Sequence, residues 1–321
     1  MNQKPIRVGV VGVGYLGFHH ARIYRELPGV SLVAVVDTNP RRLREVEERL
    51  GVAASTDLAS LWGRVDAVSV AVPTPEHHPV TLACLRHGLD VLLEKPMTAT
   101  LEEAEELVRE ASRRKAILQV GHLERFNAAV QALVPLVRDP RFIESHRLGP
   151  FLDRAAHIDV VLDLMIHDID IILSLVRSPV VEVRATGVSV VSPHLDIANA
   201  RLEFANGCVA NVTASRVSQE KQRRIRIFQQ NAYLSLDYQH QEILAYRRVQ
   251  DAAQPRPRIE HRSIPVEKGE PLRAELEAFV HAVRTRQTPL VSGEEGMKAL
   301  EVALRVLQEV EAHGYPVHPH G

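Results

Sequence analysis

The sequence predicts an α/β protein with two domains: an N-terminal doubly wound parallel sheet and a C-terminal α+β domain with a large, open, mostly antiparallel or mixed sheet. Three observations predict this. The chain has 321 residues, which exceeds the usual size of a single core. Short apolar strands alternate with helical stretches up to residue 121, and longer strand-like segments follow. We therefore expect domains at residues 1–121 and 122–321.

The N-terminal domain is predicted from five apolar runs separated by helix patterns. Continuous apolar runs are typical of parallel strands that helices cover on both faces. Thr100 is expected to cap the last helix of this domain. The predicted strands are Ile6–Val11, Ser31–Asp37, Ala67–Val72, Asp90–Leu93 and Ile117–Val120, and the helices are Gly17–Leu27, Pro40–Leu50, Leu58–Trp62, Pro79–His87 and Leu101–Arg113.

The C-terminal domain is predicted from longer segments in which apolar and polar residues alternate. Such alternation is typical of a sheet with one open face. Asn206-Gly207 is expected to form a hairpin turn, and Gln250–Pro265 an exposed loop or edge. The predicted strands are Arg141–Leu148, Val180–Val191, Ala198–Phe204, Cys208–Ser215, Arg223–Gln229 and Ala232–Asp237, and the helices are Asn127–Arg138, His157–Leu175, Pro271–Arg286 and Glu294–Glu311.

The glycine run after the first strand predicts a dinucleotide site of the Rossmann type. Gly12, Gly14 and Gly17 have Gly-x-Gly-x-x-Gly spacing, and Asp37 ends the second strand. These glycines allow a tight turn, close approach of a pyrophosphate and close packing of the helix on the sheet. Asp37 is expected to accept hydrogen bonds from the ribose hydroxyls, which favours NAD over NADP. The alternative is a glycine turn that binds no nucleotide.

Composition excludes several functional classes. The net charge of −1 gives no reason to expect binding to nucleic acid or to an anionic membrane. No apolar run approaches the ~20 residues of a membrane span, and the first residues lead into a strand without room for a signal peptide. Two cysteines, Cys84 and Cys208, fit a reducing cytoplasm, and without ligand motifs we expect no metal site.

Glu94-Lys95-Pro96 is the first candidate catalytic segment. It follows a predicted parallel strand, at the edge where open α/β sheets bind ligands. Lysine is scarce in this chain, and the Lys95 side chain could project towards a nicotinamide. The alternative is an ordinary surface lysine.

Asp163 and His167 form the second candidate. Four residues apart, they share one face if the segment is an α-helix. A carboxylate beside an imidazole stabilises its protonated form, as a general base needs. A helix N-cap acid with a structural histidine is the alternative.

Taken together, the motifs resemble the Gfo/Idh/MocA family of oxidoreductases over nearly the whole chain. The matching elements are Gly12-Val13-Gly14-Tyr15-Leu16-Gly17, Val72-Pro73-Thr74-Pro75-Glu76-His77, Glu94-Lys95-Pro96, Asp163-x-x-x-His167 and the C-terminal Ser292-Gly293-Glu294-Glu295-Gly296. The sequence departs from the family pattern at Met165 and Ala128, and neither change removes a chemical group.

The resemblance implies a role for each matching residue. His167 would take a proton from a sugar hydroxyl, Asp163 would orient His167 or contact the hydroxyls, and Lys95 would hydrogen-bond the reacting oxygen while hydride passes to the cofactor. It also implies a homodimer or homotetramer. The implied cofactor-binding residues are Gly12, Gly14, Tyr15, Leu16, Gly17, Asp37, Pro73, Thr74, His77, Glu94 and Lys95.

Two further segments, 121–127 and 214–226, are similar to family members that oxidise nucleotide-linked amino sugars such as UDP-N-acetylglucosamine at the 3-position. Arginines suit a diphosphate because they bind it bidentately. Arg224 and Arg226 could instead lie on a solvated sheet face or at an interface. The open alternatives for function are a free-sugar or inositol dehydrogenase and a non-catalytic NAD(P)-binding regulator. The implied substrate-binding residues are Arg125, Asn127, Arg216 and Lys221.

Overall fold

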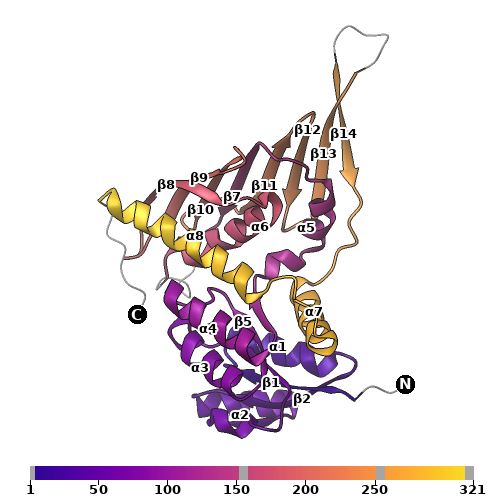
Figure 1. Ribbon diagram of the computed structural model, residues 1–321, viewed down its shortest axis with the longest axis vertical. Helices are drawn as coiled ribbons and strands as arrows, with labels where there is room; N and C mark the ends of the chain where they lie inside the picture. Colours follow the sequence, from indigo (N-terminus) through magenta and orange to yellow (C-terminus); the bar gives the residue numbers. More distant parts are fainter. Residues whose placement is uncertain (1–3, 152–157, 251–256, 315–321) are drawn as a thin grey trace. The chain divides into compact units, whose positions relative to one another are not determined.

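The computed structural model describes residues 4–151, 158–250 and 257–314 (Figure 1). The chain divides into two compact units: Met1–Leu123 with Leu272–Lys298, and Glu124–Pro271 with Ala299–Gly321. The first unit therefore includes almost all of helix α7 (Pro271–Thr285). The predicted division at residue 121 assigned this helix to the second domain. It belongs to the first unit because Leu276 and Phe279 of α7 are buried in the core of that unit.

The first unit contains one parallel sheet, as predicted. Its strand order is β3-β2-β1-β4-β5-β6, and every neighbouring pair is parallel. The order reverses at β1 and β4, where the carboxyl ends of the strands leave a crevice that binds ligands in this architecture. The strands are β1 (Ile6–Val11), β2 (Val30–Val36), β3 (Ala53–Ser55), β4 (Ala67–Val70), β5 (Asp90–Glu94) and β6 (Leu118–Gly121). Only β3 was not predicted.

The helices of the first unit begin and end largely where their caps predict. Thr100 and Glu103 form a reciprocal capping box at the start of α4. The predicted start of α3 at Pro79 is wrong, since the helix begins at Thr74. Pro75 is accommodated in its first turn, where an N–H has no helical partner. Before β6, the α-helices of this unit are α1 (Tyr15–Glu26), α2 (Pro40–Leu50), α3 (Thr74–Arg86) and α4 (Leu101–Arg114).

Two glycines of the first turn have no substitute. A Cβ on Gly17 would lie 1.8 Å from the carbonyl oxygen of Gly12. Gly12 has φ of +82°, and its Cβ would lie 2.5 Å from the carbonyl oxygen of Ala71. The turn between β1 and α1 therefore requires glycine at both positions, for the reasons that the spacing predicted.

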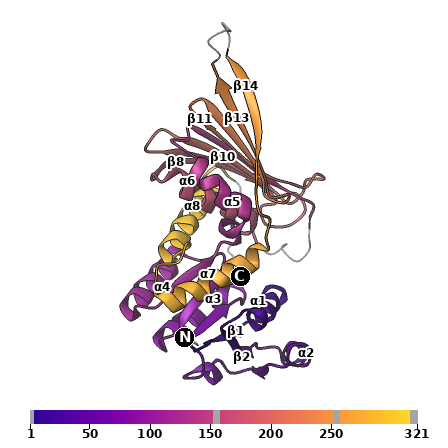
Figure 2. The same ribbon diagram turned by 90° about the vertical axis from the view of Figure 1, so that its right-hand side faces the viewer.

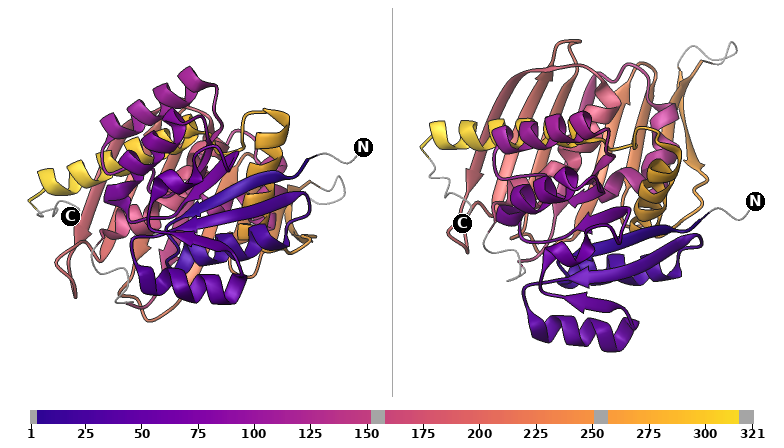
Figure 3. Two further views of the ribbon diagram at one scale, coloured as in Figure 1. Left: turned by 90° about the horizontal axis from the view of Figure 1, so that it is seen from below. Right: turned by 60° about the horizontal axis from the view of Figure 1, so that its bottom comes forward.

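The second unit contains a mixed sheet of eight strands in the order β14-β13-β12-β11-β7-β10-β9-β8. Only the β7–β10 pair is parallel, and Figure 3 shows the strands side by side. The strands are β7 (Phe142–Leu148), β8 (Val180–Val188), β9 (Ile197–Phe204), β10 (Val209–Ser215), β11 (Gln222–Gln229), β12 (Ala232–Asp237), β13 (Glu242–Val249) and β14 (Arg258–Ile264). This confirms the predicted sheet and adds β13. Within the predicted loop or edge, β14 is an edge strand, and residues 251–256 lie outside the described part.

The described helices of the second unit pack on one face of this sheet. They are α5 (Ala128–Leu133), α6 (Ile166–Val176) and the part of α8 (Gly293–Ala312) from Ala299 onward (Figure 2). The predicted helix His157–Leu175 starts later than expected, and His157 itself lies outside the described residues. The opposite face, which we call the helix-free face, carries His146 of β7 and Arg224 and Arg226 of β11. Among the described residues, no helix is long and apolar enough to cross a membrane.

Candidate functional site

The glycine turn is held to the end of β2 by Asp37. The Val13 amide donates to Oδ2 of Asp37 at 2.8 Å, and the Asn39 amide donates to Oδ1 at 2.8 Å. A Cβ on Gly14 would meet no heavy atom within 4 Å, and the neighbouring Tyr15 is 72% exposed. The backbone at Gly14 therefore faces open space, as close approach of a pyrophosphate requires. Leu16 and the buried Gly17 continue from this turn into α1.

Sequence reasoning missed Arg42, which contacts the same turn. Its Nε donates to the carbonyl oxygen of Val13 at 2.6 Å, and Nη2 donates to that of Gly14 at 3.3 Å. The guanidinium also packs over the Phe18 ring. A carboxylate and an arginine thus both lie by the turn, and an arginine in this region can accommodate a 2′-phosphate. Its position in the first turn of a helix after the second strand was the available signal.

His77 joins the loops that follow β4 and β5. One ring nitrogen lies 2.8 Å from the carbonyl oxygen of Pro96 and the other 2.9 Å from that of Val72. Burial lowers the pKa of His77 despite these two oxygens, so the imidazole is neutral at pH 7 and donates one N–H. The His77 side chain therefore positions the segments that carry Pro73, Thr74 and Lys95. Its predicted contact with the cofactor stays a prediction.

Lys95 follows directly after β5, as predicted. Its side chain is half-buried, and the Lys95–Pro96 peptide bond is cis. Glu94 is buried at the end of β5, where its Oε1 lies 3.2 Å from Nε2 of His20. The predicted contact of Glu94 with the cofactor therefore has a structural alternative.

Asp163 and His167 lie on one segment, but the α-helical spacing predicted for both is wrong. Residues Val161–Met165 form a π-helical turn, and α6 begins at Ile166. Among residues 159–172, the half-buried side chains are Asp163, Leu164 and His167, and the others are buried. The two candidate residues therefore share the least buried side of this segment. Single π turns within helices occur frequently at functional sites.

A buried ion-pair network holds α6 to β7, and sequence reasoning missed it. Arg147 Nε donates to Oδ2 of Asp168 at 2.6 Å, and its Nη1 donates to Oε1 of Glu124 at 2.9 Å. The Ser145 hydroxyl donates to Oδ1 of Asp168 at 2.8 Å. Arg147 is 3% and Asp168 0% exposed. Because Asp168 follows His167, this network fixes the helix turn that carries the candidate base. Alternation along β7 was the only sequence signal for it.

Arg125 and Asn127 are buried among partners within the second unit. Arg125 Nη1 donates to Oδ1 of Asp170 at 3.2 Å. The Asn127 amide nitrogen donates to Glu124 and to the carbonyl oxygen of Tyr238, and its Oδ1 caps α5. Both residues therefore have structural roles. Their predicted contact with a substrate stays a prediction.

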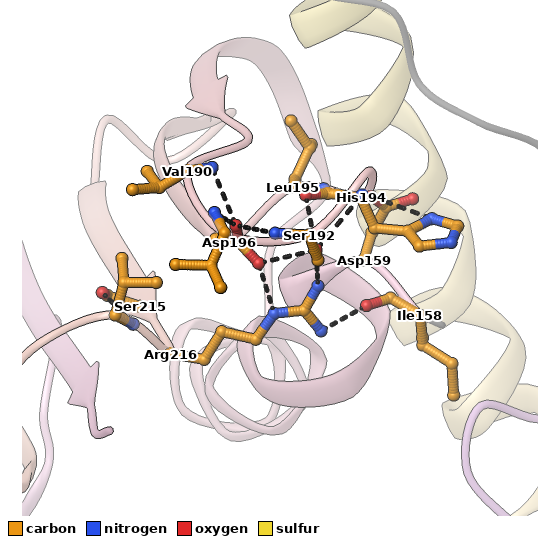
Figure 4. A network of polar contacts seen from close by, with 11 residues as sticks. Ile158, Asp159, Val190, Ser192, His194, Leu195, Asp196, Ser215 and Arg216 are labelled. Carbon is orange, nitrogen blue, oxygen red and sulfur yellow. Dashed lines mark hydrogen bonds and ion pairs between the residues drawn. The ribbon is translucent and has the colours of Figure 1, made fainter. Parts of the chain in front are cut away.

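Arg216 lies in a second buried network (Figure 4). Its guanidinium donates to Oδ1 of Asp196 at 2.8 Å, to Oγ of Ser192 and to the carbonyl oxygen of Ile158. Burial opposes ionisation of Asp196, but the amides of Ser192 and Val191 and the Arg216 side chain together hold its pKa well below the usual range. Arg216 therefore fixes the segment before β9 to the end of β10.

The basic cluster of 221–226 divides between the two faces of the sheet. Arg224 and Arg226 lie on the helix-free face, in ion pairs with Asp237 and Glu144. Arg223 lies on the other face, opposite Arg147 in the β7–β11 register, and is half-buried. Burial and the neighbouring Arg147 lower its pKa, although Asp163 is among the acids that oppose this. Arg223 is thus a candidate that sequence reasoning did not select, whereas Lys221 is exposed beside β11.

Family models match both units of the chain. A model described as an oxidoreductase family with an NAD-binding Rossmann fold matches residues 6–122. A model of the GFO/IDH/MocA C-terminal domain matches residues 129–235.

Individual relatives match over nearly their whole length. UDP-N-acetylglucosamine 3-dehydrogenase from Acidithiobacillus ferrooxidans is 38% identical over 308 residues, which cover 96% of this chain and 98% of that enzyme. A solved structure of it has a TM-score of 0.90 at 37% identity, with 97% and 99% of the two chains covered. Myo-inositol 2-dehydrogenase from Thermotoga maritima is 27% identical over 95% of this chain and 96% of its own.

Proposed function

The chain belongs to the GFO/IDH/MocA family of NAD-binding oxidoreductases, and from this premise we propose that it oxidises the 3-hydroxyl of UDP-N-acetylglucosamine with NAD. One observation carries the substrate assignment: 38% identity to the Acidithiobacillus enzyme over nearly the full length of both chains. The inositol dehydrogenases are more distant, which leaves a free sugar or inositol as the second candidate substrate.

In the proposed reaction, His167 accepts the proton as the hydroxyl O–H bond breaks. The bound nicotinamide supplies the acceptor for the hydride that leaves the same carbon, so the alcohol becomes a ketone. Lys95 donates a hydrogen bond to the oxygen and stabilises its developing negative charge. Asp163, on the same half-buried side as His167, orients the imidazole.

For the UDP group we propose Lys221 and Arg223 as contacts, with Arg125, Asn127 and Arg216 in structural roles. Exposure of Lys221 and the half-buried position of Arg223 on the face that carries Arg147 support this choice. The guanidinium of Arg223 suits bidentate binding of a diphosphate.

The experiment is a substrate panel with purified protein and NAD. UDP-N-acetylglucosamine should produce NADH absorbance, whereas free N-acetylglucosamine, myo-inositol and glucose should react at least about tenfold more slowly at equal concentration. Turnover of inositol or glucose without turnover of UDP-sugars would establish the second candidate instead. NAD binding without turnover of any sugar would indicate a regulator.

We propose NAD rather than NADP as the cofactor, because Asp37 lies at the end of β2 beside the glycine turn. Replacing Asp37 by asparagine should raise the dissociation constant of NADH about 10- to 150-fold, since a hydrogen bond to a charged group contributes about 1.5–3 kcal/mol. The preference for NAD over NADP should narrow because the repelling charge is lost. Fluorescence titration with NADH and NADPH measures both effects.

Asp57→Asn is the matched control for this prediction. Asp57 caps a short helical turn in the same unit by accepting from the Ala59 amide at 2.9 Å. It should leave NADH affinity within about twofold of the wild type. Equal NADH affinity of Asp37→Asn and wild type would contradict the role of Asp37.

We also propose a homo-oligomer that works in a reducing cytoplasm. Both cysteines, Cys84 and Cys208, are buried free thiols. The helix-free face carries stacked rings of Phe228, Tyr233 and Tyr246, an apolar strip suited to a second copy. Light scattering of the purified chain reports the number of copies.

A further inference from the structure

Three titratable side chains meet inside the first unit, at the end of β5. They are His20 from α1, Glu94 from β5 and Glu275 from α7, and their polar atoms all lie within 4.8 Å of one another. His20 is 0% exposed, Glu94 7% and Glu275 1%. The cluster is therefore closed to solvent. Its member Glu94 directly precedes Lys95 in the chain.

The charges of this cluster do not balance without an extra proton. His20 Nε2 lies 3.2 Å from Oε1 of Glu94. Among the described residues, both carboxyl oxygens of Glu275 lack a hydrogen-bond partner, and no ion pair joins Glu275 to a lysine or arginine. Two ionised carboxylates beside one imidazole would leave net negative charge in a buried place, which is costly.

Glu275 is the carboxyl group whose surroundings most favour the protonated form. The groups that face it are His20 and Tyr24 from α1, Glu94 from β5 and the uncharged Gln119 from β6. Burial raises the pKa of Glu275 well above its usual value, and the charge of Glu94 raises it further. The pKa of Tyr24 is raised too, mainly by burial, so its hydroxyl stays neutral and bonded to Ser69.

Glu94 has no room to withdraw from this cluster. A Cβ on Gly121 of β6 would lie 2.9 Å from the carboxyl carbon and from both oxygens of Glu94. The Glu94 side chain is therefore packed between the β6 backbone and the other two members. Because the Glu94 side chain cannot withdraw by itself, repulsion from a second negative charge on Glu275 would be relieved only by a shift of the backbone at the end of β5, and with it of the turn at Lys95.

We propose that Glu275 is a positioning residue that stays protonated at neutral pH and thereby keeps Glu94, and through it Lys95, in place. When Glu275 ionises at alkaline pH, repulsion from Glu94 displaces the turn and turnover falls. The catalytic consequence rests on the proposed function, because it assumes that Lys95 acts on the substrate.

Glu275→Gln tests this directly, since glutamine has the same shape and is neutral at every pH. At pH 7 its kcat should be within about threefold of the wild type. Above the pH at which Glu275 ionises, wild-type kcat should fall while that of Glu275→Gln continues unchanged. Glu277→Gln on the exposed side of α7, paired with Arg273, is the control and should follow the wild type.

Unfolding measured against pH gives a second readout that needs no substrate. Because the pKa of Glu275 is raised on folding, the folded state binds the extra proton. The wild-type ratio of folded to unfolded protein should therefore fall as pH rises from about 4.5 to the raised pKa, by at most about tenfold per pH unit. Glu275→Gln should lack this slope relative to the wild type.

The outcomes separate this proposal from the proposed function. Loss of kcat in Glu275→Gln at pH 7, an unchanged alkaline limb, or a stoichiometric divalent metal bound to the purified protein would each overturn it. If Glu275→Gln does not fold, infrared spectra of the wild type must show a protonated carboxyl group at pH 7, and its absence overturns the proposal. If no sugar is oxidised, the proposed function fails. The pH dependence of unfolding still shows whether Glu275 is protonated in the folded state.

Discussion

Replacing His167 by asparagine should lower kcat about 10²- to 10⁴-fold, the range that a positioned general base contributes. Asparagine keeps a polar side chain of similar size but cannot take a proton from the sugar hydroxyl. NADH affinity should stay within about twofold of the wild type, because the residues proposed to bind the cofactor lie on the first unit. Steady-state kinetics and fluorescence titration with NADH measure the two quantities.

His146→Asn is the matched control, since it makes the same change in the same unit on the helix-free face. Its kcat should be within about twofold of the wild type. The limb of the pH–rate profile that reports deprotonation of the base should vanish in His167→Asn and persist in His146→Asn. Unchanged turnover of His167→Asn would show that another group takes the proton.

The first unit was predictable because local signals determine most of it. The turn at Gly12 and Gly17 admits only glycine, so its spacing predicted strand, turn and helix together. Helix α2 has the predicted bounds because Asn39 caps its start and Gly51 takes the left-handed conformation at its end. The prediction was wrong at the start of α3, because it took Pro79 as the first residue of the helix. The structure keeps Pro79 inside the helix and accommodates Pro75 in the first turn.

The candidate site of the second unit was less predictable, because it depends on which face of a strand a residue occupies. The basic cluster was visible in the sequence, but a shift of one residue moves a side chain across the sheet. Arg223 therefore lies on the same face of the sheet as Arg147, while Arg224 pairs with Asp237 on the helix-free face. Nothing local shows that Arg216 pairs with Asp196, twenty residues away.

Two further features, the π turn before α6 and strand β14, could not be predicted because the sequence gives only weak signals for them. The π turn of Val161–Met165 lies in an almost wholly buried segment. Apolar residues occupy most sides of this segment, so the sequence shows no periodic spacing of apolar and polar residues. Strand β14 has exposed side chains on both faces except at Ile264, so it lacks the alternation that identifies a half-buried strand.

Replacing Arg147 by methionine should lower the free energy of unfolding by about 3–5 kcal/mol, the cost of leaving a buried charge uncompensated. Methionine fills similar space but leaves Asp168 and Glu124 without their shared partner. Such a loss is a large part of a typical stability of 5–15 kcal/mol. Urea unfolding at pH 7 measures it.

Arg226→Met controls for the loss of an arginine on the neighbouring strand. Its ion pair with Glu144 is partly exposed, with side chains 37% and 30% accessible, so removal should cost less than about 1 kcal/mol. If both variants lost equally little stability, the buried network would not anchor α6.

The pH dependence of Arg147→Met distinguishes an orphaned charge from a packing defect. Without Arg147, the two buried carboxylates have lost their shared positive partner, and taking up protons would relieve the cost of their charge. The folded variant then binds more protons, so its deficit relative to the wild type should shrink as pH falls from 8 towards 5. A deficit that is constant over this range would assign the loss to packing. Because Asp168 adjoins His167, a true charge defect should also lower kcat at pH 8 more than at pH 6 relative to the wild type.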